Sequence, residues 1–169
     1  MTGKAAGEVA ASKGRAAYGL TGEPPEAIVL TCSDPRFQKA FDEFTRDLGL
    51  REGTFVRLVV SGGGWVLLNA ATLPGKDFQA LRERIDLHCR LSPTIRRLVM
   101  VIHDDCRWYE HAVGGGRGAG SAGSEPSRET LRRGQEALGV HLAAPLEMEV
   151  YHARFKDEGR REVEFERVL

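Results

Sequence analysis

Two short segments, far apart in the chain, carry the residue types that bind transition metals. Residues 32–36 are Cys-Ser-Asp-Pro-Arg, and residues 103–106 are His-Asp-Asp-Cys. Two thiolates and one imidazole supply three of the four ligands of a tetrahedral zinc site, with bonds of about 2.3 Å to sulfur and about 2.0–2.1 Å to nitrogen. The sequence therefore predicts a metal site formed by Cys32, His103 and Cys106, and the identity of the fourth ligand decides what the metal can do.

Each of the two segments follows a run that predicts a buried strand. Residues 28–31 are Ile-Val-Leu-Thr, and residues 98–102 are Leu-Val-Met-Val-Ile. Continuous apolar and β-branched runs of this length are typical of strands covered on both faces. If the two strands are parallel members of one sheet, their carboxyl ends bring both segments to the same edge, where α/β sheets bind ligands. Asp34 and Arg36 would then lie beside the metal site.

The remaining pattern alternates strands with helices. An apolar stripe of Phe37, Phe41, Phe44 and Leu48 predicts a helix from Arg36 to about Leu48, with Asp34 as its N-cap and Pro35 in its first turn. The predicted strands are 27–32, 54–60, 97–103 and 147–155, with 162–168 as the second arm of a terminal hairpin, and further helices are predicted at 77–91 and 126–138. This order predicts a Rossmann-like, three-layer α/β/α fold whose mostly parallel sheet ends in an antiparallel hairpin.

Three regions leave alternatives open. Residues 1–26 form an N-terminal arm, either docked on a partner subunit or frayed, ahead of a single domain at 27–169. Glycines dominate residues 114–124, which form either a flap over the site or a plain surface loop. Glycines also follow Ser61, where they form either a pocket wall or a flexible turn. His88 and Cys89, on one predicted helix, are interpreted as packing residues.

Composition narrows the classes of function. The 169 residues contain 24 basic and 24 acidic side chains, which argues against nucleic acid or an anionic membrane surface as a partner. No apolar run reaches the roughly 18–20 residues that a membrane span needs. Three cysteines cannot all pair, so a reducing cytoplasm is the expected location. No G-x-G-x-x-G follows the first strand, so dinucleotide binding has no support.

The two segments together resemble the zinc signature of the β-class carbonic anhydrases, C-x-D-x-R followed by H-x-x-C. The resemblance extends from about Ala27 to Tyr109 and includes the terminal hairpin. It implies that Cys32, His103 and Cys106 bind Zn²⁺ and that Asp34 and Arg36 form a catalytic dyad beside it. It also implies a zinc lyase that reversibly hydrates carbon dioxide to bicarbonate, assembled as a homodimer or a larger homo-oligomer.

The dyad has two possible states. Asp34 can accept a hydrogen bond from a zinc-bound water, or it can itself become the fourth ligand and close the site. Arg36 can hold Asp34 away from the metal through a paired, charge-assisted hydrogen bond. We expect a rise in pH to favour the open state, because hydroxide then competes better for the metal.

The chain departs from the family pattern near the site. Arg107 stands where most members have glycine, and Val60-Ser61-Gly62-Gly63 replaces a turn rich in polar side chains. Two alternatives therefore stay open: hydrolysis of carbonyl sulfide or carbon disulfide at the same site, or a non-catalytic zinc protein with a structural or partner-binding role. His111 is either a proton shuttle or an ordinary surface histidine.

Overall fold

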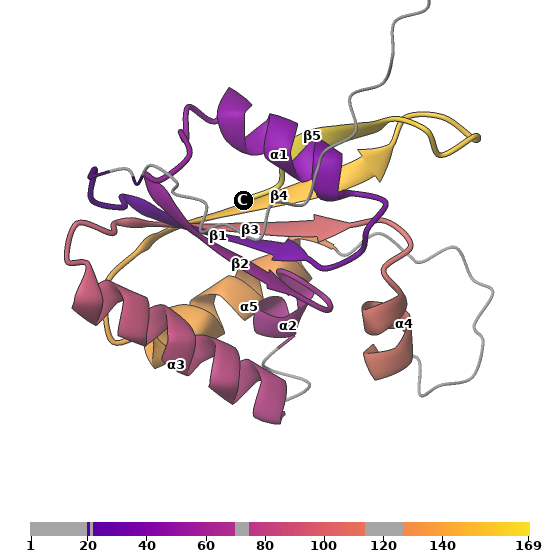
Figure 1. Cartoon of the computed structure of the whole chain (residues 1–169). Coiled ribbons are helices and arrows are strands. Elements are labelled where there is room, and N and C mark those ends of the chain that lie inside the picture. The colour runs from indigo at the N-terminus through magenta and orange to yellow at the C-terminus, as the bar shows by residue number, and fades with distance from the viewer. Residues whose placement is uncertain (1–19, 21, 70–74, 114–126) are drawn as a thin grey trace, which may run out of the picture.

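The computed structural model describes residues 20, 22–69, 75–113 and 127–169, and in these parts of the chain five strands form one sheet (Figure 1). The strand order is β2-β1-β3-β4-β5. The strands are β1 (Ala27–Cys32), β2 (Phe55–Val60), β3 (Arg97–His103), β4 (Glu147–Phe155) and β5 (Val163–Arg167). β1 to β4 pair in parallel, and β5 pairs with β4 in the antiparallel sense. The predicted fold class is confirmed.

Helices cover both faces of this sheet. One face carries α1 (Gln38–Asp47), and the other carries α2 (Trp65–Leu68), α3 (Lys76–Leu91) and α5 (Arg128–His141) (Figure 1). The short α4 (Arg107–Val113) lies beyond the carboxyl ends of β1 and β3. This edge of the sheet is therefore the place where the segments around both predicted ligand groups meet.

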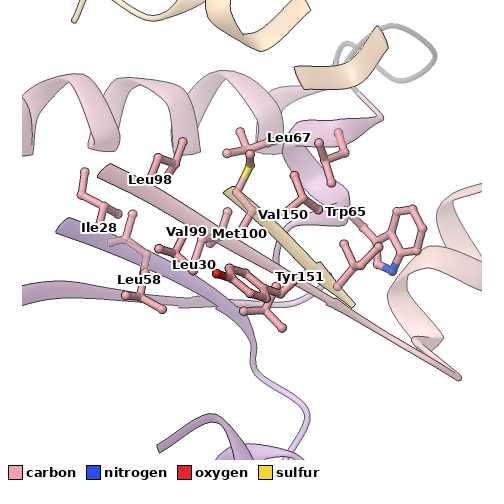
Figure 2. Packing of buried hydrophobic residues seen from close by; sticks show 14 of the residues in the cluster. Ile28, Leu30, Leu58, Trp65, Leu67, Leu98, Val99, Met100, Val150 and Tyr151 are labelled. Carbon is pink, nitrogen blue, oxygen red and sulfur yellow. The ribbon is translucent and has the colours of Figure 1, made fainter. Parts of the chain in front are cut away.

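The two central strands have the burial that their sequences predict. Every residue of β1 is buried, and so is every residue of β3 after Arg97. Figure 2 draws part of this core, with Leu98, Met100 and Val150 from the sheet and Trp65 and Leu67 from α2. Dense packing on both faces fixes the ends of these strands, because a shift of either one would open voids in the core.

Two details of the predicted elements are wrong. Asp34 is not the N-cap of α1: Phe37 occupies that position and makes no side-chain cap. Oδ1 of Asp34 instead accepts from the backbone N–H of Arg36 at 3.0 Å, and the Arg36 guanidinium holds the same carboxylate. The helix therefore starts two residues later than predicted. The second difference is α2, which the sequence analysis did not predict because four residues are too few for a periodic pattern to emerge.

Two predictions lie outside the described residues. They concern the N-terminal arm, of which most residues are not described, and the glycine-rich segment 114–124, of which none is described. Docking of the arm and closure of a flap therefore stay predictions. No helix in the described ranges is long and apolar enough to cross a membrane.

Candidate metal centre

The three predicted ligands converge at the carboxyl edge of the sheet. Cys32 is the last residue of β1, His103 is the last residue of the adjacent strand β3, and Cys106 directly precedes α4. One potential ligand atom from each lies within 4.8 Å of the other two, and all three residues are buried. Tetrahedral ligands with bonds of about 2.0–2.3 Å lie about 3.5 Å apart, so only a small adjustment would bring these atoms around one ion.

The side chain of His103 forms a hydrogen bond through one ring nitrogen, and the other ring nitrogen is available to bind a metal ion. Its Nδ1 lies 2.7 Å from the carbonyl oxygen of Asp104, and because a carbonyl only accepts, Nδ1 carries the proton. In the neutral imidazole, Nε2 is then the nitrogen with the free lone pair. It is buried and has no hydrogen-bond partner among the described residues. A buried lone pair without a partner, close to two sulfurs, fits a metal ligand, and the donor set of two sulfurs and one nitrogen suits Zn²⁺.

Neighbouring side chains fix the orientation of the imidazole. The Phe37 ring packs against the ring of His103 with 4.2 Å between centroids. The Asp104 carboxylate is tied to β4, since it accepts from Nε2 of His152 at 2.8 Å and from the backbone N–H of Phe155 at 3.0 Å. These two bonds hold the Asp104 carbonyl group toward Nδ1 of His103. They also keep the pKa of the Asp104 carboxyl below its ordinary value although burial acts in the opposite direction.

The two thiols interact directly. A hydrogen bond from Cys106 lowers the pKa of the Cys32 thiol well below its ordinary value, against the effect of burial. The same bond, together with burial, raises the pKa of Cys106. Two sulfurs that share one proton in this way form a compact, ready-made pair of soft donors for a cation.

Asp34 and Arg36 form the paired contact that the sequence analysis considered. Nε of Arg36 donates to Oδ1 of Asp34 at 3.0 Å, and Nη2 donates to Oδ2 at 2.7 Å. This bidentate contact holds the pKa of the Asp34 carboxyl below its usual range and raises the pKa of Arg36. The carboxylate is thus ionised and turned toward Arg36.

Gln38 anchors the loop that carries this pair. Its side-chain amide donates to the carbonyl oxygen of Cys32 at 2.9 Å and to that of Asp34 at 2.8 Å. Gln38 was not predicted as a site residue, and it carries no sequence signal because glutamine is an ordinary helix-forming residue. Gln38 therefore fixes the backbone of the loop between β1 and α1 at Cys32 and at Asp34.

The turn after β2 lies against the centre because it contains glycine. Gly63 has a φ of +51°, and a Cβ atom there would lie 2.6 Å from the backbone nitrogen of Cys32. At Gly62, with a φ of +91°, a Cβ would lie 2.5 Å from the Trp108 ring. Of the two interpretations of this turn, a wall of the site is the one that these close contacts support.

An open hollow of about 360 Å³ lies over the cluster. Its lining includes Cys32, Asp34, Arg36, Gly62, Cys106 and Arg107. Ser33 and Ser61 also line it, and their hydroxyl oxygens are 3.2 Å apart. The hollow thus combines two of the three predicted metal ligands, Cys32 and Cys106, with the dyad and one additional exposed cation, Arg107.

Comparison with known proteins gives distant similarities. No family model matches the sequence, and no curated protein matches it. Among solved structures, the chain is similar to the β-carbonic anhydrase of the fungal pathogen Aspergillus fumigatus, with 18% identity and a TM-score of 0.44 over 88% of this chain and 78% of that one. It is also similar to a structure from a study of two tetrameric β-carbonic anhydrases of Sordaria macrospora, with 17% identity and a TM-score of 0.36 over 85% and 81%. The function proposed below depends on the side chains of this chain.

Proposed function

We propose that this protein is a zinc-dependent carbonic anhydrase that reversibly hydrates carbon dioxide to bicarbonate. The observation that carries the proposal is the gathering of Cys32, His103 and Cys106 within 4.8 Å. The bidentate pair of Asp34 and Arg36 lines the same hollow as the two cysteines. When bound by these three residues, zinc would supply a Lewis acid that lowers the pKa of a water molecule and so provides a nucleophile near neutral pH.

Within this proposal, the protein's own groups position the reactants. The Asp34 carboxylate accepts a hydrogen bond from the attacking water and so orients its lone pair toward carbon dioxide. Arg36 holds Asp34 in that orientation and keeps it from occupying the fourth metal position. The exposed Arg107 at the rim offers a positive charge to the bicarbonate product.

A stopped-flow assay of carbon dioxide hydration on zinc-loaded protein tests the proposal. We expect Asp34→Asn to lower the rate by about 100-fold, as for loss of a positioned acid–base group, with zinc content unchanged. Asp42→Asn is the matched control, since Asp42 pairs with Arg57 on the surface away from the hollow. Full zinc content with no hydration between pH 7 and 9 would instead indicate a non-catalytic zinc protein, and faster turnover of carbonyl sulfide or carbon disulfide would change the substrate.

The proposal includes two statements about the whole protein. A homodimer or a larger homo-oligomer is expected, as the Sordaria macrospora enzymes are described as tetrameric. A cytoplasmic location is expected from the free thiols of Cys32 and Cys106. The molar mass in solution, measured by light scattering, tests the first statement, and a monomer at micromolar concentration would contradict it.

A further inference from the structure

Asp105, between the two ligands of the second segment, connects two arginines from distant parts of the chain. Its Oδ2 accepts from Nη1 of Arg36 at 2.9 Å and from Nη1 of Arg160 at 2.8 Å. Its carbonyl oxygen accepts from Nη2 of Arg36 at 3.2 Å. Arg36 belongs to the loop after β1, and Arg160 belongs to the turn between β4 and β5. One carboxylate therefore joins the dyad to the terminal hairpin.

The backbone at both ends of the Asp105–Arg160 contact is unusual. Asp105 has a φ of +54° and Arg160 a φ of +53°, and they are the two non-glycine residues with positive φ in the described ranges. A residue with a Cβ adopts this conformation at an energetic cost, so the surrounding contacts must maintain it. The guanidinium of Arg160 also lies over the Phe155 ring, 5.3 Å from its centroid. The strained residues are thus held by each other and by the end of β4.

With the contact to Asp105, every nitrogen of the Arg36 guanidinium forms a hydrogen bond to an aspartate. Asp34 accepts from Nε and Nη2, and Asp105 accepts from Nη1 and Nη2. The Arg36 side chain is 43% exposed, and an exposed arginine with one carboxylate partner retains much of its rotational freedom. With a second carboxylate at its far end, the planar group keeps its Nε edge toward Asp34.

We propose that Asp105 is a positioning residue that holds Arg36 against Asp34 and thereby keeps Asp34 off the fourth metal position, with Arg160 of the hairpin strengthening the hold. The inference rests on the proposed metal site and deepens it. The adjacent aspartates then have separate tasks: Asp104 orients the imidazole of His103 through β4, and Asp105 orients the dyad through the β4–β5 turn.

Azide binding to the cobalt(II)-substituted protein, followed by visible absorption, tests this role without turnover. Azide enters the metal site when the fourth position is free, so its dissociation constant reports how often Asp34 occupies that position. Asp105→Gly removes the carboxylate and relieves the backbone strain at positive φ, and Asp105→Asn keeps an uncharged acceptor in a residue that tolerates this conformation.

We expect Asp105→Gly to weaken azide binding by about five-fold, the size of one charge-assisted hydrogen bond at a partly exposed site. Asp105→Asn and Arg160→Ala are expected to give smaller changes in the same direction. Arg161→Ala is the matched control, since Arg161 is the neighbouring exposed arginine. Only its backbone N–H forms a hydrogen bond, and its guanidinium pairs with no carboxylate among the described residues. All variants are expected to keep a full equivalent of cobalt.

A double-mutant cycle separates positioning from a structural role. If Asp105 acts through Arg36, then Asp105→Gly has no further effect on azide affinity once Arg36→Ala is present. Equal effects in both backgrounds, or an unchanged azide affinity in Asp105→Gly while Arg36→Ala weakens it, would overturn the inference. If azide binds more weakly to Asp105→Gly than to the wild type, but the zinc-loaded wild type does not hydrate carbon dioxide, the positioning role is supported and the proposed activity is overturned.

Discussion

Nε2 of His103 has no hydrogen-bond partner among the described residues, because the other ring nitrogen, Nδ1, bonds to the carbonyl oxygen of Asp104. Nε2 is therefore available to a metal ion together with the sulfurs of Cys32 and Cys106. The sequence could predict which three side chains gather here, since each half of the motif is local and follows a strand, and their binding of zinc stays a prediction. It could not predict the groups that orient them. His152 reaches Asp104 from 48 residues further along the chain, and Arg160 reaches Asp105 from 55. Such contacts depend on the final fold.

Loss of the Asp104 carboxylate tests this support of the imidazole. Asp104→Ala leaves Cys32, His103 and Cys106 in place and removes both side-chain bonds of Asp104 to β4, so that only the backbone bond from its N–H to the carbonyl oxygen of Ala153 remains; we expect zinc affinity to fall by about ten-fold or more. Competition with a chromophoric chelator measures the change. Glu110→Ala, which removes an exposed carboxylate from α4, serves as the control. Equal zinc affinity in Asp104→Ala and the wild type would contradict the role of Asp104.

At the level of elements, the strands with continuous apolar runs were the most predictable. β1, β3 and β4 have the bounds that their sequences predict, because burial on both faces leaves little choice of residue type. The start of α1 was wrong because Asp34, a good N-cap by type, is held by Arg36 instead. α2 was not predicted, because four residues are too few to show a helical period. All four are buried, and α2 packs against α3 and α5.

Close contact between α2 and α5 depends on one glycine. A Cβ at Gly134 would lie 2.1 Å from the carbonyl oxygen of Leu68, so Gly134→Ala forces the two helices apart. We expect a loss of about 1–3 kcal/mol in the free energy of unfolding, the usual cost of overpacking. Gly139→Ala is the control in the same helix, since its Cβ would meet only the flexible end of Met148 at 3.3 Å. Urea denaturation measures both, and equal stabilities would contradict the packing described here.

A buried carboxylate links β3 and β4. Glu149 accepts from Nε of Arg97 at 2.8 Å and from the Tyr151 hydroxyl at 2.9 Å. Burial raises the pKa of Glu149, but these two bonds outweigh it and hold the pKa below the ordinary value of 4.5. Its contribution to stability is therefore complete above about pH 4.5 and is lost as the pH falls through the folded-state pKa.

Glu149→Gln tests that contribution. At pH 7 we expect a loss of about 2 kcal/mol in the free energy of unfolding, because Arg97 keeps its charge without a charged partner. The difference from the wild type is expected to shrink below pH 4.5, which urea denaturation across a pH series would measure. Glu147→Gln, at an exposed position of the same strand, is the control. A difference that grows toward low pH would contradict the assigned sign.

For the whole molecule, the site exists because β1 and β3 are parallel neighbours. This adjacency puts Cys32 and His103 at one edge of the sheet although they are 71 positions apart in the sequence. The sequence predicted parallel strands but not their order, because order is decided by how the helices cover the two faces. The order β2-β1-β3 makes one metal centre possible, and any order that separated β1 from β3 would divide its ligands between two places.

Zinc content per chain tests this convergence most directly. Elemental analysis of protein purified without chelators would compare the wild type with Cys32→Ser and Cys89→Ser, the latter a control because Cys89 lies on α3 and not in the cluster. The account predicts a full equivalent of zinc in the wild type and in Cys89→Ser, and almost none in Cys32→Ser. Retention of a full equivalent by Cys32→Ser would contradict it.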